Sequence, residues 1–180
     1  VEHDTMDTTF RSMYLGLSAF LDANTERREL LLGQRPPRFD SSFDEAIAQA
    51  GDDFERVALK AQAARDYFLL VGPPGTGKTS RALRRMVEHF YAASSMQILL
   101  LAYTNRAVDE ICQSLSSITP CIDYIRVGSE LSCDVRFRGH LLENILAECN
   151  SRREVNIRMA DCRVYVGTVA SIAAKAELFK

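Results

Sequence analysis

Four short apolar runs follow one another from residue 67 onward, and each is followed by a segment with helical spacing. The runs are residues 67–72, 97–105, 123–128 and 162–168. A continuous apolar run of this length is typical of a strand that is covered on both faces. The helical segments are residues 78–93, 106–117, 137–150 and 169–178. Strands that alternate with helices predict an α/β fold, in which a parallel sheet carries helices on both faces.

The residues before the first apolar run predict helices instead of strands. Helical spacing of apolar residues is found over 5–35 (Phe10, Met13, Tyr14, Leu17, Phe20, Leu21) and over 53–66 (Phe54, Val57, Ala58, Ala61). Between them, the glycine, prolines and serines of GQRPPRFDSS predict a loop over 33–42. We therefore expect a helical N-terminal segment, 1–52, with a connector loop at 33–42, followed by an α/β domain over 53–180.

Composition limits the classes of protein to consider. The chain has 180 residues, of which 47% are hydrophobic and 26% charged, as in globular domains. Residues 61–180 carry 15 basic and 12 acidic side chains, against 7 and 12 in residues 1–60, which favours an anionic partner for the second part. No apolar run approaches the roughly 18 residues of a membrane span, so no membrane contact is expected. The five cysteines form no CxxC pair, which indicates reduced thiols and an intracellular protein.

The first apolar run ends in a motif that is typical of phosphate binding. The residues Gly72-Pro73-Pro74-Gly75-Thr76-Gly77-Lys78-Thr79 fit the pattern G-x-x-x-x-G-K-[ST]. Glycines let successive backbone N–H groups turn inward, where they cradle phosphates at the start of a helix. Lys78 can reach the β- and γ-phosphates, and the Thr79 hydroxyl suits a ligand position on Mg²⁺. The motif and the following Ser80 therefore predict a nucleotide site, with Lys78 and Thr79 as its catalytic residues.

Three stretches together resemble the superfamily 1 helicases. GPPGTGKT looks like their motif I, which AAA+ ATPases also use, and ILLLAYTNRAVDEI (98–111) resembles motif Ia. ADCRVYVGTVASI (160–172) resembles the later strand-to-helix motif, in which a threonine after the strand meets nucleic acid. The likeness covers residues 66–172 and is closest to the 5′-to-3′ branch, which holds the replication nuclease-helicases and the nonsense-mediated decay helicase. RRELLLGQRPPRFD (27–40) looks like the connector before this core in the replication-type members.

The resemblance implies the N-terminal part of a RecA-like domain with a P-loop NTPase fold. It implies ATP and Mg²⁺ as cofactors, and a parent protein that couples ATP hydrolysis to movement on single-stranded nucleic acid. DNA is favoured over RNA, in replication and repair. It places Thr104, Asn105 and Thr168 on the path of the strand. With Gly72, these residues are expected at the carboxyl ends of parallel strands, where ligands bind. Thr104 and Asn105 also occupy positions that suit helix N-caps.

The sequence departs from the family pattern in two places. The family usually reads adenine with a glutamine upstream of motif I, but that position holds Glu55, and Gln62 is the glutamine nearby. No strand ends in the Asp-Glu pair that holds Mg²⁺ and activates water, and Asp109 and Glu110 are expected to be ordinary first-turn helix acids. In the family this pair and the second RecA-like domain follow later, so we expect the 180-residue chain to bind nucleotide without turnover. Alternatives are an AAA+-type ATPase or other P-loop motor, a phosphate-loop kinase, or a nucleotide-binding module.

Overall fold

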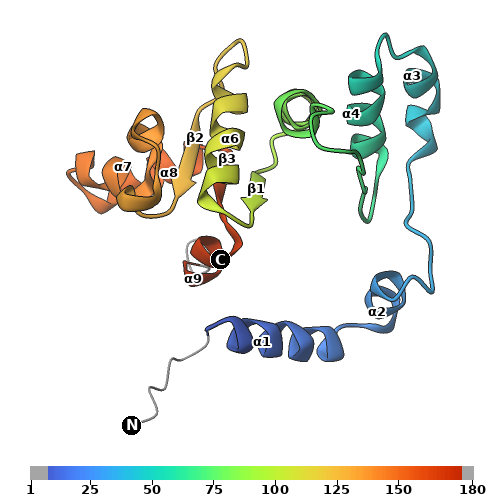
Figure 1. The fold of residues 1–180 in the computed structure, drawn as a ribbon, viewed down its shortest axis with the longest axis horizontal. Coiled ribbons are helices and arrows are strands. Elements are labelled where there is room, and N and C mark those ends of the chain that lie inside the picture. The colour runs from blue at the N-terminus through green and yellow to red at the C-terminus, as the bar shows by residue number, and fades with distance from the viewer. Residues whose placement is uncertain (1–7, 176–180) are drawn as a thin grey trace. The chain divides into compact units, whose positions relative to one another are not determined.

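The computed structural model describes residues 8–175, which form two units. One unit consists of residues 8–39 together with 64–67, and the other of 40–63 together with 68–175. Figure 1 shows the order of the elements along the chain. The division at residue 52 that we expected from the sequence stays a prediction, while the expected helical character of the N-terminal segment is confirmed.

The first unit contains two helices, α1 (Thr8–Asp22) and α2 (Thr25–Leu31). Asn24 separates them, because its side chain accepts a hydrogen bond from the backbone N–H of Arg27 at 2.8 Å and so caps α2. The loop expected over 33–42 begins at Gly33, whose φ of 69° is in the left-handed region. Residues 5–7, which we also expected to be helical, lie outside the described residues.

An ion-pair cluster ties the connector of the first unit to segment 64–67. The Asp66 side chain is 7% exposed and receives hydrogen bonds from Arg38 at 2.8–3.2 Å and from Arg35 at 3.1 Å. Glu26 pairs with the same two arginines at 3.3 and 3.7 Å. The hydrogen bonds from Arg38, and then those from Arg35, hold the pKa of Asp66 well below its usual range. The segment that leads into the glycine-rich motif is thus pinned to the connector by a carboxylate that stays ionised at neutral pH.

The second unit is built on a three-stranded sheet. Its strands are β1 (Ile98–Ala102), β2 (Tyr124–Val127) and β3 (Val164–Thr168), in the order β1-β3-β2, and both pairings are parallel. Val164 is in register with both Ile98 and Tyr124, so the three strands start at the same level. Their carboxyl ends therefore meet at one edge of the sheet. The predicted parallel sheet is confirmed.

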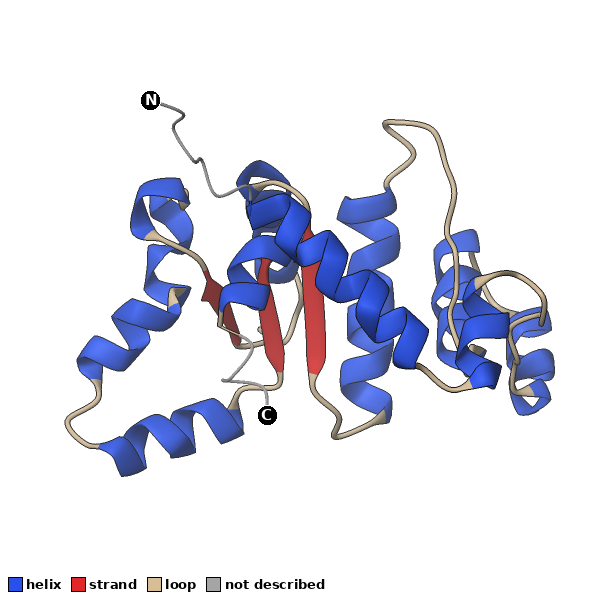
Figure 2. Cartoon of the chain, turned by 90° about the horizontal axis from the view of Figure 1, so that it is seen from below, coloured by secondary structure: helices blue, strands red, loops and turns tan. Residues whose placement is uncertain are grey.

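Helices cover both faces of β2 and β3, but only one face of β1, where Leu100 is buried while Leu99 and Leu101 are each 45% exposed. The expectation that the run at 97–105 is covered on both faces is therefore wrong. Val164 and Val166 pack in one core with α6 (Asn105–Ser116), while Tyr165 packs in a second core with α7 (Leu142–Glu148). Figure 2 shows helices on the two sides of the red strands. The remaining helices of this unit are α3 (Asp44–Gln49), α4 (Asp53–Ala63), α5 (Arg84–Ala93), α8 (Arg152–Asp161) and α9 (Val169–Ala174). Shorter turns are the π-helix Lys78–Leu83 and 3-10 helices at Ser41–Phe43, Glu130–Ser132 and Val135–His140.

The prediction of a buried strand over 67–72 is wrong. These residues form no strand, and Leu69 and Val71 are 75% and 92% exposed. A buried parallel strand needs a hydrogen-bonded neighbour, and residues 67–72 pair with none of the three strands found within residues 8–175. The apolar run therefore has the composition of a core strand without the ladder that would bury it. Gly72 consequently does not lie at the end of a strand, contrary to expectation.

One helix was missed and one was placed too early. Residues 137–140 of the predicted helix 137–150 belong to the 3-10 helix Val135–His140, and α7 begins only at Leu142. Helix α8 has Val155, Ile157 and Met159 spaced two residues apart, a strand-like alternation that hides its helical character. The sequence did contain a start signal for this helix, since Ser151 is followed three residues later by Glu154. In the structure, Ser151 accepts from the N–H of Glu154 at 3.2 Å, and Glu154 accepts from the N–H of Asn150 at 2.7 Å.

Three of the five cysteines are core residues. All five are free thiols, and Cys112, Cys133 and Cys162 are buried. Burial raises the pKa of Cys112 to about 11, so this thiol stays protonated and unreactive. Over residues 8–175, the structure contains no helix that combines the length and the apolar character needed to cross a membrane.

Substituting Gly167 tests how closely the sheet is covered. A Cβ atom at Gly167 would lie 2.9 Å from the carbonyl oxygen of Val127 and 3.1 Å from the side chain of Ile172. Because the nearer atom belongs to the backbone of a paired strand, Gly167→Ala should lower the free energy of unfolding by about 1–3 kcal/mol in urea denaturation. Gly128→Ala is the control, since its Cβ would meet no atom within 4 Å. Equal midpoints for the two variants would contradict this packing.

Candidate functional site

The phosphate loop, residues 72–80, has the backbone that its glycines were expected to provide. Gly75 and Gly77 have φ values of 80° and 81°, in the region that other residues rarely adopt. Gly77 directly precedes the π-helix that starts at Lys78 and continues into α5. The chain therefore turns sharply at two glycines and enters a helix, which is the local geometry that phosphate binding needs.

The phosphate loop presents an ammonium group and backbone N–H donors that are complementary to an anion. The Lys78 ammonium donates to the carbonyl oxygens of Gly72 and Pro73, the latter at 2.6 Å, and the Thr76 hydroxyl donates to Pro73 at 2.8 Å. Within residues 8–175, the backbone N–H groups of 75–77 donate no hydrogen bond. Free N–H groups beside an ammonium at the start of a helix are complementary to phosphate oxygens, for which Lys78 can exchange its two carbonyl partners.

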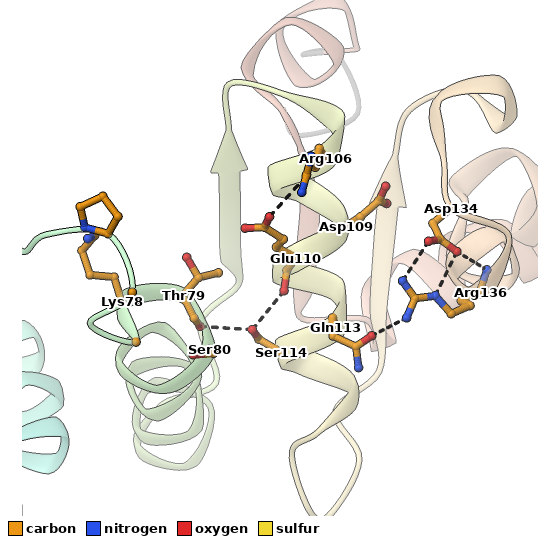
Figure 3. Close-up of a pocket in the computed structure, with 13 residues that line it drawn as sticks. Lys78, Thr79, Ser80, Arg106, Asp109, Glu110, Gln113, Ser114, Asp134 and Arg136 are labelled. Atoms are coloured by element: carbon orange, nitrogen blue, oxygen red, sulfur yellow. Dashed lines mark hydrogen bonds and ion pairs between the residues drawn. The ribbon is translucent and has the colours of Figure 1, made fainter.

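The phosphate loop forms one wall of a cavity of about 720 Å³, which lies within the range of about 300–1,000 Å³ found for ligand sites. The wall opposite the loop is the polar face of α6, as Figure 3 shows. A third side is closed by residues at the start of the 3-10 helix Val135–His140. The cavity-lining residues beyond the loop are Arg106, Asp109, Glu110, Gln113, Ser114, Asp134 and Arg136.

Asp109 is more than the ordinary first-turn acid that the sequence suggested. Its carboxylate lies 2.6 Å from the guanidinium of Arg126, a side chain on β2 that is only 1% exposed. Arg126 also donates to the carbonyl oxygen of Ser132 at 3.2 Å. A buried guanidinium requires such partners, because an unpaired charge in the core is strongly destabilising. No sequence signal marked Arg126, since an arginine within an apolar run more often points to solvent.

A second arginine orders the rim of the cavity. Arg136 donates to both carboxylate oxygens of Asp134, at 2.9 and 3.1 Å, and to the side-chain oxygen of Gln113 on α6 at 2.8 Å. The hydrogen bonds from Arg136 hold the pKa of Asp134 at about 2, so this carboxylate is charged at neutral pH. The sequence analysis singled out none of Gln113, Asp134 and Arg136, because the hydrogen bond between Arg136 and Gln113 joins side chains that are 23 positions apart.

The three residues expected on a nucleic-acid path gather at the carboxyl edge of the sheet. Thr104 follows β1, and Ala102 at the end of β1 is in register with Thr168 at the end of β3. Thr104 caps α6, since its hydroxyl oxygen accepts from the N–H of Ala107 at 3.2 Å, while Asn105 is the first residue of the helix. Thr168 is 7% exposed, and its hydroxyl caps α9. The cap expected at Thr104 is confirmed, and the contact of these residues with nucleic acid stays a prediction.

Glu55 acts as a helix cap. Its carboxylate accepts from the N–H of Gly51 at 2.8 Å, and its own N–H donates to Asp52 at 2.8 Å, which forms a capping box at the start of α4. Among the described residues that line the 720 Å³ cavity, neither Glu55 nor Gln62 is present. The geometry therefore assigns no adenine-reading role to either side chain.

The site fits a nucleotide that brings a divalent metal with it. Thr79 carries a hydroxyl that makes no hydrogen bond within the described residues, and it faces the same cavity as Lys78. Over residues 8–175, no three histidine, cysteine or acidic side chains are grouped so that they could hold a metal by themselves. A metal here would therefore take most of its ligands from phosphate and water, as Mg²⁺ commonly does.

Comparison with known proteins relates this arrangement to a family. Residues 49–173 match the family described as AAA domain. The chain is 33% identical over 138 residues to the DNA replication ATP-dependent helicase/nuclease JHS1 of Arabidopsis thaliana, a match that covers 71% of the chain and 10% of that protein.

Two further relatives carry helicase names. Identity to the DNA replication ATP-dependent helicase/nuclease DNA2 of Homo sapiens is 33% over 113 residues, 56% of the chain and 10% of that protein. Identity to the RNA helicase Mov10l1 of Mus musculus is 29% over 106 residues, 58% of the chain and 8% of that protein. The chain thus spans a tenth or less of the length of these curated relatives.

The ion pair between Asp109 and Arg126 can be tested by removing the partner that lies nearer the surface. Asp109→Ala leaves the buried guanidinium without its counter-charge, so the free energy of unfolding should fall by about 3 kcal/mol or more. Arg106→Ala is the control, because it removes a pair on the same helix in which the arginine side chain is 92% exposed, and it should cost less than about 1 kcal/mol. Urea denaturation measures both. If both variants lower the free energy of unfolding by similar amounts, the buried ion pair does not stabilise the fold more than an exposed pair does.

Proposed function

The chain belongs to the superfamily 1 helicases through the AAA domain matched over residues 49–173, and we propose that it binds ATP with Mg²⁺ at the phosphate loop. The observation that carries the proposal is the loop itself. Its two left-handed glycines and Lys78 border one cavity, and the N–H groups of 75–77 in the same loop donate no hydrogen bond within residues 8–175. Bound Mg²⁺ would neutralise charge on the β- and γ-phosphates, and Thr79 would supply a hydroxyl ligand.

The work of this chain's own residues is to hold and orient the triphosphate. Lys78 would leave its carbonyl partners for phosphate oxygens, and the N–H groups of 75–77 would hold those oxygens in one orientation. No described strand ends in a carboxylate that could orient water, since Tyr103, Gly128 and Val169 follow β1, β2 and β3. The 180-residue chain is therefore expected to bind nucleotide and to hydrolyse it very slowly.

The larger protein is proposed to couple ATP hydrolysis to movement along single-stranded nucleic acid. The groups that suit contacts with the sugar-phosphate backbone lie where β1 and β3 lead into their helices. They are the hydroxyls of Thr104 and Thr168, the side-chain amide of Asn105 and the backbone beside them. DNA is proposed over RNA because the match to JHS1 covers more of the chain, at higher identity, than the match to Mov10l1. A second RecA-like domain is the expected partner of the site.

Lys78→Ala tests the nucleotide site. Loss of two charge-assisted hydrogen bonds should lower the affinity for ATP and for ADP by about a hundredfold in isothermal titration calorimetry. The fold should be kept, because Lys78 contacts only carbonyl oxygens of the loop itself. Lys60→Ala is the control, since Lys60 is exposed on α4. If wild type and Lys78→Ala bind with equal affinity, the phosphate-loop assignment is wrong.

Asn105→Ala tests the nucleic-acid path. A lost contact with the sugar-phosphate backbone should weaken binding of short single strands about fivefold, equally for all base sequences and less at high salt. Fluorescence anisotropy with DNA and RNA strands over a salt series measures this and compares the two nucleic acids. Asn156→Ala, on the exposed surface of α8, serves as the matched control. Unchanged affinity in Asn105→Ala, or an effect confined to particular bases, would remove this residue from the path.

A further inference from the structure

One buried hydroxyl joins the phosphate loop to α6. Ser114 is 7% exposed, and its Oγ lies 3.2 Å from the carbonyl oxygen of Thr79 and 3.0 Å from that of Glu110. The hydroxyl has a single proton, which the two carbonyl oxygens share. The contact with Glu110 lies within the helix, whereas the contact with Thr79 spans 35 positions and joins two elements. Figure 3 shows both dashed lines meeting at Ser114, between the π-helix and α6. A serine in the middle of a helix costs little when its hydroxyl bonds back one turn, so the contact with Thr79 is what distinguishes this position.

The acceptor of this bond is a residue of the nucleotide site. Thr79 is the proposed hydroxyl ligand of Mg²⁺, and it directly follows Lys78, the proposed phosphate ligand. The segment that carries both is a π-helix, Lys78–Leu83, and π-helical turns are frequent at functional sites. A change in the backbone at Thr79 when phosphate binds would therefore act first on the Ser114 hydroxyl.

The donor of this bond belongs to a helix that cannot absorb the change locally. Val108, Ile111, Cys112 and Leu115 bury one side of α6 in the core, and Asp109 pairs with the buried Arg126. Packed helices of this kind move as rigid elements. The same helix begins at the proposed nucleic-acid contacts, with Thr104 as its cap and Asn105 as its first residue.

We propose that Ser114 is a positioning residue, which couples the occupancy of the phosphate loop by nucleotide to the conformation of the α6 N-terminus, where nucleic acid would bind. The proposal rests on the proposed function, because it needs a nucleotide at the loop. It assigns the coupling to a single hydrogen bond between Ser114 Oγ and the Thr79 carbonyl oxygen. Removal of that bond should separate the response of the α6 N-terminus from the response of the phosphate loop.

The test follows backbone amide signals of the 180-residue chain by ¹⁵N nuclear magnetic resonance while Mg²⁺ and ADP are added. In the wild type, amides of the phosphate loop, 75–80, and of the α6 N-terminus, 104–107, should both shift. In Ser114→Ala the loop amides should still shift, while the response at 104–107 should be lost. Ser114→Thr keeps the hydroxyl and should restore the response at the helix end.

Ser116→Ala is the matched control. Ser116 lies on the same helix and makes the same bond one turn back, to the carbonyl oxygen of Cys112 at 2.9 Å, but it has no contact with the phosphate loop. Its response should equal that of the wild type. A purely structural weakening of α6 would show as a lower melting temperature and as shifts without ligand, and it would not separate the two sets of amides.

The outcomes distinguish the two proposals. If the loop amides of the wild type do not respond to nucleotide, the proposed function fails and the coupling fails with it. If the loop responds but residues 104–107 do not, or if they respond equally in Ser114→Ala, the coupling through Ser114 is overturned and the nucleotide site stands. An affinity measurement adds a second readout: ADP should change the dissociation constant for single-stranded DNA by about fivefold or more in the wild type, and by less in Ser114→Ala.

Discussion

The ion pair between Asp109 and Arg126 ties α6 to β2, and the geometry of the candidate site depends on how α6 lies against the sheet. Arg126 is almost fully buried on β2, so its charge must keep a partner. Rotation of α6 about its axis would withdraw Asp109 and leave the guanidinium unpaired in the core. Together with the apolar side of α6 that is buried in the core, the pair fixes which residues of α6 face the sheet and which face the cavity beside the phosphate loop.

This constraint explains how the phosphate loop is held without a strand behind it. The segment before Gly72 has no sheet partner among the described residues, and Val71 is almost fully exposed. The loop is instead supported from the side, because the π-helix that follows it packs against α6 and the Thr79 carbonyl oxygen accepts from Ser114. The position of the proposed nucleotide site thus follows from packing between two helices.

The parallel register of the three strands positions the polar residues of the proposed nucleic-acid path. Because β1 and β2 both pair with β3 at the same level, the polar residues after β1 and at the end of β3 reach one edge of the sheet. Thr104 and Thr168 already have a structural role there as helix caps. A hydroxyl that caps a helix leaves neighbouring N–H groups at the helix start, which is where a phosphate group can bind.

The sequence alone determined the features that depend on near neighbours along the chain. The glycines and lysine of the phosphate loop, the helical spacing of α6 and the apolar runs of β2 and β3 could be predicted, because backbone freedom, side-chain period and capping act within a few residues. The tertiary structure decided whether the run at 67–72 was buried, since a strand needs a partner from elsewhere in the chain. It also decided the partners of Arg126 and Ser114, because pairing of a buried charge or hydroxyl depends on groups 17 and 35 positions away that only folding brings within reach.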